Sequence, residues 1–428
     1  MIVHYRKSIL NILIQEKESI NYYNMTTKDE LQDYAVKLIE TNLNDNLLLS
    51  WATGLGKSLA FIKIQETHYK NETTYIIVNE RNHIQNWKNE YIKYGKEELL
   101  KNTKIFCYAS LKKYLNKKIG LLGLDEAHHA LSPARIEFLD TLEVKKTVAL
   151  TATLTTIQKE LLINLFGNFV EHKFLLKKAT ENNILVQPKI YLIGLDLDTT
   201  NNYLEYIVSW GSKAKQIVLY DDISNKALYN RQRYPNLQLH LRTTEAAYNM
   251  IINQDIEFYK QQYVMNPNPY NKFKWLSLSS QRKTFLGEIK SKALKILLDE
   301  LKHKKYLCYC ASINQANLIG ESYNTIHSGK PEKENDIIIN NFNTGKINNI
   351  IAVSKLTEGQ NLTGLNTVIL TNLDAKDRTF IQRTGRALRS EEPEIYILYH
   401  KGTRDELVLE NVFTNINNEN IFYRDLII

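Results

Sequence analysis

The residues best suited to chemistry form a glycine-rich loop near the start of the chain. Residues 52–58, with the sequence ATGLGKS, follow an apolar run at 47–51 and precede a helix-compatible segment. Glycines let backbone N–H groups surround phosphate oxygens, and the following helix N-terminus adds a partial positive charge. Lys57 would reach the β- and γ-phosphates, and Ser58 would ligate Mg²⁺. The spacing predicts a nucleotide-binding loop, although Trp51 stands where the general pattern has a glycine.

A pair of adjacent carboxylates follows another apolar run. Residues 121–124 (LLGL) lead directly into Asp125 and Glu126. Asp125 is suited to holding Mg²⁺ through its water shell, and Glu126 to orienting and deprotonating an attacking water. Taken alone, these residues could equally start a helix. Together with the loop at 52–58 they predict a site that hydrolyses a nucleotide.

Two hydroxyl residues follow the apolar run at 147–150. Thr151 and Thr153 could bond to the acidic segment and relay the state of the nucleotide, or they could form a local hydroxyl turn. The sequence separation of Lys57 and Asp125 leaves room for two βα crossovers. We therefore expect the two strand ends that carry them to lie side by side in one sheet.

Arginines dominate the segment QRTGRALR at 382–389. Arg386 and Arg389 are three residues apart and share one face if the segment is helical. Two such arginines suit a polyphosphate, and across an interdomain cleft they would neutralise charge that develops on the γ-phosphate. Without the other motifs, a solvated basic helix face would be an equal interpretation.

The apolar runs place these motifs on two sheets. In the first half of the chain they alternate with helix-compatible segments, and Thr27 with Glu30 predicts a capped helix start. Strands separated by helices indicate βαβ units with parallel strands, so the predicted fold class is α/β with two lobes. The predicted strands are residues 47–51, 75–78, 104–108, 120–124 and 147–150 in the first lobe, and 306–310, 325–327, 349–353, 367–371 and 394–399 in the second.

The predicted domains are an N-terminal extension (1–30), a first lobe (31–185) and a second lobe (186–428). Residues 200–285 are polar, aromatic-rich and mostly helix-compatible, and we interpret them as a mainly helical insertion in the second lobe, with a turn at 266–269. Basic and aromatic residues alternate there at 229–234 and 272–275, which suits base stacking or strand separation. Ordinary packing with solvated charge is the alternative.

The composition fits a multidomain globular protein with a polyanionic partner. The 428 residues include 55 Lys and Arg against 47 Asp and Glu, a net charge of +8, which suits nucleic acid without proving it. Three cysteines and scattered histidines show neither a disulfide framework nor a zinc site with ordinary ligand spacing. No apolar run is long enough to span a membrane. We expect a cytoplasmic protein that does not contact a membrane.

In this order the motifs resemble those of superfamily 2 DEAD/DEAH-box helicases and translocases, over about residues 31–400. The matching segments are 52–58 (motif I), 125–128 (motif II), 151–153 (motif III), 356–362 (motif V) and 382–389 (motif VI). The resemblance is strongest to phage helicases and to the motor subunits of restriction enzymes. Two departures are Ala35, where the family often has an adenine-reading glutamine, and Leu154, where motif III often ends in proline.

The resemblance implies two RecA-like P-loop domains with parallel sheets and with ATP in the cleft between them. It assigns catalysis to Glu126, Asp125, Gln382, Arg386 and Arg389. It assigns nucleotide contacts to Thr53, Gly54, Leu55, Gly56, Lys57, Ser58 and Arg383, with Mg²⁺ on Ser58 and Asp125. Coupling of the nucleotide to the nucleic-acid strand falls to Thr151, Thr153, Thr357, Glu358 and Gly359.

The implied function is that of an ATP- and Mg²⁺-dependent helicase or translocase. We expect a monomer that acts on single-stranded or branched DNA in replication, recombination or repair, in the bacterial cytoplasm if a phage encodes it. An RNA helicase is one alternative. A nucleotide-gated assembly or transcription-complex ATPase that does not unwind is another. Stimulation of ATP hydrolysis by DNA, by RNA or by neither separates the three.

Overall fold

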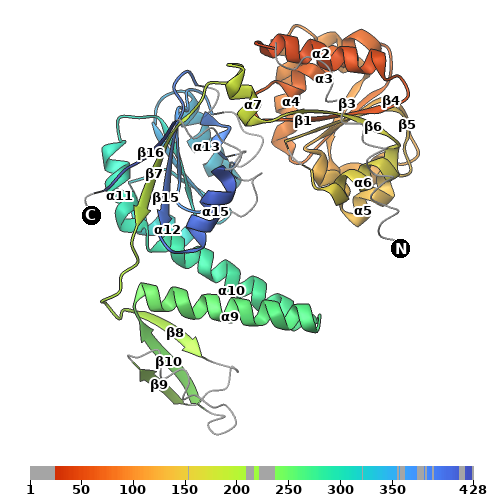
Figure 1. The fold of residues 1–428 in the computed structure, drawn as a ribbon. Helices are drawn as coiled ribbons and strands as arrows, with labels where there is room; N and C mark the ends of the chain where they lie inside the picture. The colour runs from red at the N-terminus through yellow and green to blue at the C-terminus, as the bar shows by residue number, and fades with distance from the viewer. Residues whose placement is uncertain are drawn as a thin grey trace.

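Two lobes, each built on a parallel sheet, make up most of the molecule (Figure 1). The structure is a computed structural model. It describes residues 25–428 except 153, 209–215, 221–236, 321, 354–355, 357–361, 374–379, 381–382, 388–389, 414–419 and 427–428.

The first lobe contains six parallel strands in the order β3-β2-β4-β5-β1-β6. The strands are β1 (Asn46–Trp51), β2 (Thr74–Val78), β3 (Thr103–Cys107), β4 (Lys118–Asp125), β5 (Glu143–Thr151) and β6 (Phe169–Phe174). The helices are α2 (Lys28–Thr41), α3 (Lys57–His68), α4 (Arg81–Lys93), α5 (Pro133–Leu139), α6 (Thr156–Phe166) and α7 (Leu176–Glu181). Every residue of β1 and β2 is buried, as expected of parallel strands covered by helices on both faces.

The start of α2 is fixed by the predicted capping box. The Thr27 hydroxyl accepts a hydrogen bond from the Glu30 backbone N–H, and the Glu30 carboxylate accepts one from the Thr27 N–H. Buried Lys146 holds the turn that follows α2, because its ammonium donates to the carbonyls of Asn42, Leu43 and Asp45. These contacts orient α2 against the first lobe, beside α3.

The second lobe contains seven parallel strands in the order β12-β13-β11-β14-β15-β7-β16. The strands are β7 (Lys189–Leu195), β11 (Tyr306–Cys310), β12 (Thr325–Ile326), β13 (Asn349–Val353), β14 (Thr367–Leu370), β15 (Glu394–His400) and β16 (Ile421–Tyr423). Its helices are α11 (Ser291–Glu300), α12 (Ile313–Ile319), α13 (Glu332–Asn343) and α15 (Arg404–Phe413). Two separate apolar clusters cover the two faces of this sheet.

The insertion between β7 and α11 consists of a small sheet and two long helices. The elements are β8 (Leu204–Val208), β9 (Gln216–Tyr220), β10 (Leu237–Thr243), α9 (Glu245–Met265) and α10 (Pro269–Glu288). In Figure 1, α9 and α10 form an antiparallel hairpin that projects from the second lobe. We call this hairpin the arm. Helices predominate among the described residues, as predicted, but the three-stranded sheet was not predicted.

All ten predicted strands exist, and the turn between α9 and α10 falls at 266–268. The expectation that the strands of Lys57 and Asp125 are neighbours is wrong, because β5 lies between β1 and β4. The prediction also missed β6, β7 and β16. In the part of the chain that the structure describes, no helix is both long and apolar enough to cross a membrane.

Candidate nucleotide site

The predicted phosphate loop connects the end of β1 to the start of α3. Gly54 and Gly56 have φ angles of +92° and +80°, in the left-handed region that favours glycine. Gly56 directly precedes α3, so the first backbone N–H groups of that helix face the loop. The Lys57 ammonium donates to the Trp51 carbonyl at 2.9 Å, which places it across the loop opening from its own helix.

These groups fit the triphosphate of a nucleotide. The loop offers backbone N–H groups, the N-terminus of a 12-residue helix and one ammonium, all of which favour an anion. The Lys57 and Ser58 side chains are only partly buried. Lys57 can therefore exchange its carbonyl partner for a phosphate oxygen without opening the core.

The acidic pair lies at the carboxyl end of β4, on the same edge of the sheet as the loop. Glu126 has a φ of +46°, which turns the chain sharply after Asp125. Its carboxylate lies 3.5 Å from His128 Nδ1. Strained backbone at a non-glycine residue is costly and concentrates at functional sites, which supports the predicted role of Glu126.

Three aromatic side chains hold Asp125, and sequence reasoning assigned none of them to it. Trp87 Nε1 donates to Asp125 Oδ2 at 2.9 Å, and His83 Nδ1 lies 3.8 Å from the same oxygen. The Tyr108 hydroxyl donates to the Asp125 backbone carbonyl at 3.1 Å. Burial, followed by the charges of Asp125 and Glu126, raises the Tyr108 pKa well above its ordinary value, so this hydroxyl stays a donor. Trp87, on α4, is only 3% exposed, so the indole end of its bond to Asp125 is shielded from water.

Gln32 of α2 supports the phosphate loop from beneath. Its Nε2 donates to the Leu55 carbonyl at 3.3 Å, and a Cβ atom at Gly56 would lie 2.2 Å from that nitrogen. Gly56 is therefore required for this approach as well as for its backbone angle. The sequence has Ala35 where we expected an adenine-reading glutamine, and the glutamine present in this segment, Gln32, bonds to the loop.

The residue that breaks the general loop pattern has a defined buried partner. Trp51 Nε1 donates to His172 Nδ1 at 3.0 Å across the β1–β6 pair. Both side chains are buried. Burial and the nearby Lys178 lower the pKa of His172 to about 3, so the imidazole is neutral and can accept this bond.

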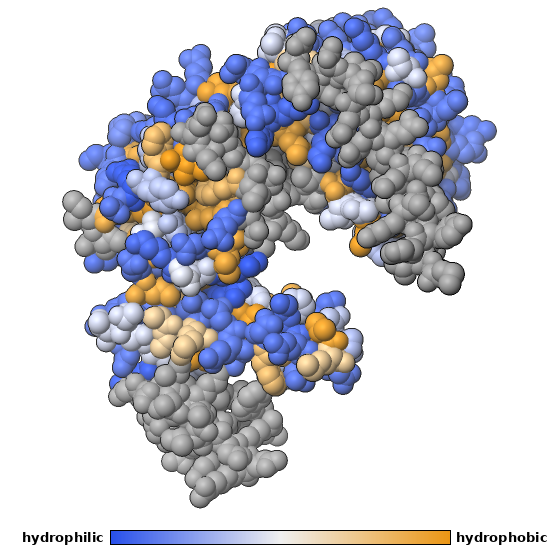
Figure 2. Space-filling model, in the orientation of Figure 1, coloured by the Kyte–Doolittle hydropathy of each residue, from blue (hydrophilic) through white to orange (hydrophobic). Residues whose placement is uncertain are grey.

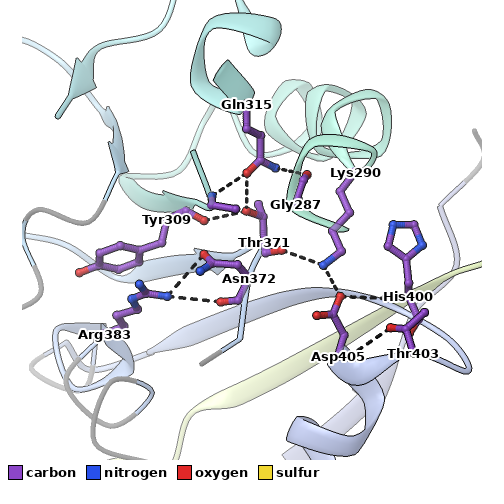
Figure 3. A network of polar contacts seen from close by, with 11 residues as sticks. Gly287, Lys290, Tyr309, Gln315, Thr371, Asn372, Arg383, His400, Thr403 and Asp405 are labelled. Carbon is purple, nitrogen blue, oxygen red and sulfur yellow. Dashed lines mark hydrogen bonds and ion pairs between the residues drawn. The ribbon is translucent and has the colours of Figure 1, made fainter. Parts of the chain in front are cut away.

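The arginine segment lies beside Tyr309 of β11 in the second lobe. Arg383 is buried, donates to the Asn372 carbonyl at 3.3 Å and stacks 4.9 Å from the centre of the Tyr309 ring (Figure 3). Arg386 is partly buried and hydrogen-bonds to the Tyr309 hydroxyl. That hydroxyl donates to the Leu356 carbonyl at 2.7 Å. Tyr309 therefore joins the arginine segment to Leu356, the first residue of the predicted motif V segment.

A second set of contacts ties the base of the arm to the same sheet edge (Figure 3). Gln315 Nε2 donates to the Gly287 carbonyl, and Gln315 Oε1 accepts from the Thr371 hydroxyl at 3.0 Å. Fully buried Lys290 donates to the Thr371 carbonyl and forms an ion pair with Asp405. The end of α10 is thereby fixed to the strand that precedes Asn372, the partner of Arg383.

The structure describes part of the predicted site. The carboxyl ends of β1, β4 and β5 bring the loop, the acidic pair and buried Thr151 to one sheet edge, with Asp125 paired to Leu150. Arg383 and Arg386 lie in the second lobe, and the contacts given above are with that lobe. The predicted residues Thr153, Thr357, Glu358, Gly359, Gln382 and Arg389 lie outside the described residues.

Comparisons with known proteins agree with this division of the chain. Residues 15–156 match the family model "Type III restriction enzyme, res subunit", and residues 289–391 match "Helicase conserved C-terminal domain". The two matches fall on the loop with the acidic pair and on the arginine segment, in the order predicted. The chain is a superfamily 2 helicase.

Similar proteins include a curated relative and a solved structure. The "DNA 3'-5' translocase XPB2" of Sulfurisphaera tokodaii is 22% identical over 408 residues, which span 91% of this chain and 85% of that protein. The structure of S. cerevisiae Dbp5 bound to RNA and ADP BeF3 has a TM-score of 0.56 at 12% identity, covering 92% of this chain and 89% of that one. At this low identity, the likeness to Dbp5 shows only that the two proteins share a fold.

The helicase is therefore an ATP hydrolase that works on nucleic acid. The match to a restriction-enzyme subunit agrees with the predicted likeness to restriction motors. A phage origin stays a prediction.

Proposed function

We propose that this helicase uses ATP and Mg²⁺ to move along DNA. The observation that carries the proposal is that Asp125 and Glu126 lie at the same sheet edge as the phosphate loop. The chain also aligns over 91% of its length with a DNA translocase. The relative acts on DNA by its name, and the basic excess of this chain suits the same polyanion.

In the proposed reaction the loop residues Thr53, Gly54, Leu55, Gly56 and Lys57 bind the triphosphate of ATP. Ser58 and Asp125 would hold Mg²⁺, which when bound would neutralise phosphate charge. Trp87 orients the carboxylate of Asp125 for this role. One or two protein ligands are sufficient, because Mg²⁺ retains waters and binds phosphate oxygens.

Glu126 takes a proton from the attacking water as the water oxygen bonds to the γ-phosphorus, and the bond to the ADP oxygen breaks. In this proposal Arg386 and Arg389 neutralise the developing charge when the second lobe closes on the nucleotide, and Gln382 of the same sequence motif takes part in catalysis. Arg383 was predicted to contact the nucleotide, but it is buried against Tyr309 and Asn372, so in this proposal it positions Arg386 from within its own lobe. Five residues are proposed to couple nucleotide hydrolysis to movement on the nucleic-acid strand. They are Thr151, Thr153, Thr357, Glu358 and Gly359.

ATP hydrolysis measured with single-stranded, duplex and branched DNA and with RNA tests the proposal. We expect a DNA form to stimulate turnover most, in a helicase that acts as a monomer. If stimulation requires RNA, the helicase moves along RNA and not along DNA. If no nucleic acid changes the rate of ATP turnover, the result supports a nucleotide-gated assembly factor.

A further inference from the structure

The free end of the arm exposes apolar side chains that no core uses. The base of the arm has its own cluster, in which Tyr248, Ile252 and Phe285 pack together with Tyr206 of β8. Beyond this cluster the arm exposes large apolar residues, and Figure 2 shows apolar surface between hydrophilic residues there. The exposed residues are Phe258, Val264, Met265, Tyr270, Phe273 and Leu276. We call residues 258–276 the arm tip.

Half of the exposed apolar residues of the arm tip lie on one helix face. Tyr270, Phe273 and Leu276 are spaced three apart on α10 and so share a face of that helix. Their exposed fractions are 55%, 66% and 52%, and Met265 at the end of α9 is 78% exposed. Contiguous apolar surface rimmed by polar residues is typical of a binding site, because water solvates it poorly.

Positive charge exceeds negative charge around this surface. The arm tip contains Lys260, Lys272 and Lys274 and no acidic residue. Glu257, which directly precedes the arm tip, forms an ion pair with Lys260, so the positive excess rests on Lys272 and Lys274. Two of these ammonium groups lie beside aromatic faces: Lys272 Nζ is 6.0 Å from the Tyr263 ring centre, and Lys274 Nζ is 5.8 Å from that of Tyr270. Positive groups and exposed rings therefore occupy the same surface.

From this juxtaposition we propose that the arm tip binds a single nucleic-acid strand. Exposed rings at Tyr270 and Phe273 stack on unpaired bases, and the lysines beside them bind the phosphates. The positive excess at Lys272 and Lys274 fits a polyanion. A nucleic-acid strand bound there would pull on the base of the arm, where Gln315 and Lys290 bond to Thr371, the residue before the Arg383 partner Asn372. This inference rests on the proposed function only in that the helicase binds nucleic acid.

The test uses the full chain and a labelled oligothymidine strand, with binding measured by fluorescence anisotropy at several salt concentrations. Tyr270→Ala with Phe273→Ala should weaken binding by about 10-fold or more, the usual loss when stacking rings are removed. Lys272→Ala with Lys274→Ala should weaken binding and make the plot of log affinity against log salt shallower by about 1.4, for two lost phosphate contacts.

Two matched controls lie elsewhere on the second lobe. Lys292→Ala with Lys295→Ala removes two exposed lysines of α11, and Leu407→Ala removes an exposed apolar residue of α15. Both should bind the strand as the unaltered chain does. All variants should keep the ATP hydrolysis rate measured without nucleic acid, because no altered residue belongs to the nucleotide site.

The outcomes separate this proposal from the proposed function. If the unaltered chain binds DNA and is stimulated by it, but the arm-tip variants bind the strand equally well, the arm tip is not the strand site. Unchanged strand binding with loss of a protein partner in the arm-tip variants would likewise overturn it in favour of protein docking. If the unaltered chain binds no single strand at any salt concentration, the arm-tip proposal fails, whereas the proposed function is still decided by the ATP hydrolysis assay with duplex and branched DNA.

Discussion

The bond between Trp87 and Asp125 makes a testable contribution to ATP turnover. Trp87→Phe keeps an aromatic ring in the core, including its edge contact with Phe61, but removes the N–H that donates to Asp125 at 2.9 Å. A hydrogen bond to a charged group contributes about 1.5–3 kcal/mol. Because 19% of the Asp125 side chain is exposed, water replaces part of that interaction. We therefore expect a loss of about 1–2 kcal/mol, or roughly a 5- to 30-fold lower kcat.

The assay is steady-state ATP hydrolysis at saturating nucleic acid over a range of Mg²⁺ concentrations, with unfolding followed in parallel. The variant should also need more Mg²⁺, because its carboxylate is free to rotate. Phe61→Leu is the control, since it disturbs the packing of Trp87 and leaves the Nε1 bond in place. A kcat within twofold of the unaltered value, or an equal loss in both variants at matched stability, would show that the bond does not orient Asp125.

Three further changes test other contacts. Tyr309→Phe removes the hydroxyl that donates to the Leu356 carbonyl and bonds to Arg386, so kcat should fall by about 5- to 30-fold with little change in ATP affinity; a change confined to KM would contradict the link. Lys290→Met leaves Asp405 buried without its cation and should destabilise the second lobe by about 3–5 kcal/mol in urea unfolding, whereas Lys290→Met with Asp405→Leu should recover most of that loss. His172 has a pKa of about 3 in the folded chain against about 6.5 in the unfolded chain, so its contribution to folding stability is complete above pH 6.5 and is lost as the pH falls toward 3. His172→Gln should therefore lower the slope of unfolding free energy against pH by about 1.4 kcal/mol per pH unit in this range. An unchanged slope would refute the assignment.

The positions of the loop and the acidic pair could be predicted because local sequence determines them. β1 and β4 are apolar runs that end directly at the functional residues, and parallel strands bring their carboxyl ends to one edge. Strand order depends on pairings between distant segments, which a single sequence does not specify. For that reason the insertion of β5 between β1 and β4 was missed.

β6 escaped prediction because polar residues interrupt its apolar pattern. Glu171 is buried against the Ser50 hydroxyl and Lys159, and His172 accepts from Trp51. These partners lie up to 121 residues away in the sequence. Burial of polar side chains becomes favourable only once such partners are in place.

The supporting residues of the site escaped prediction for the same reason. Trp87 looks like part of an amphipathic helix until the fold brings its N–H to Asp125 at the end of β4. Gln32 looks like a surface residue until α2 packs against the phosphate loop. Trp51, in place of the expected glycine, did indicate a buried polar partner, because the N–H of a buried tryptophan needs an acceptor. The sequence did not indicate that this partner is His172.

Displacement of a protein block from DNA tests most directly whether ATP hydrolysis moves this helicase along DNA. The substrate is single-stranded or branched DNA carrying biotin with bound streptavidin, and free biotin captures what is released. We predict ATP-dependent release by the unaltered chain, and none by Glu126→Gln, which should bind ATP but lose about 100-fold or more in turnover. Release that is equal without ATP or in Glu126→Gln, or DNA-stimulated hydrolysis without any release, would contradict movement along the strand.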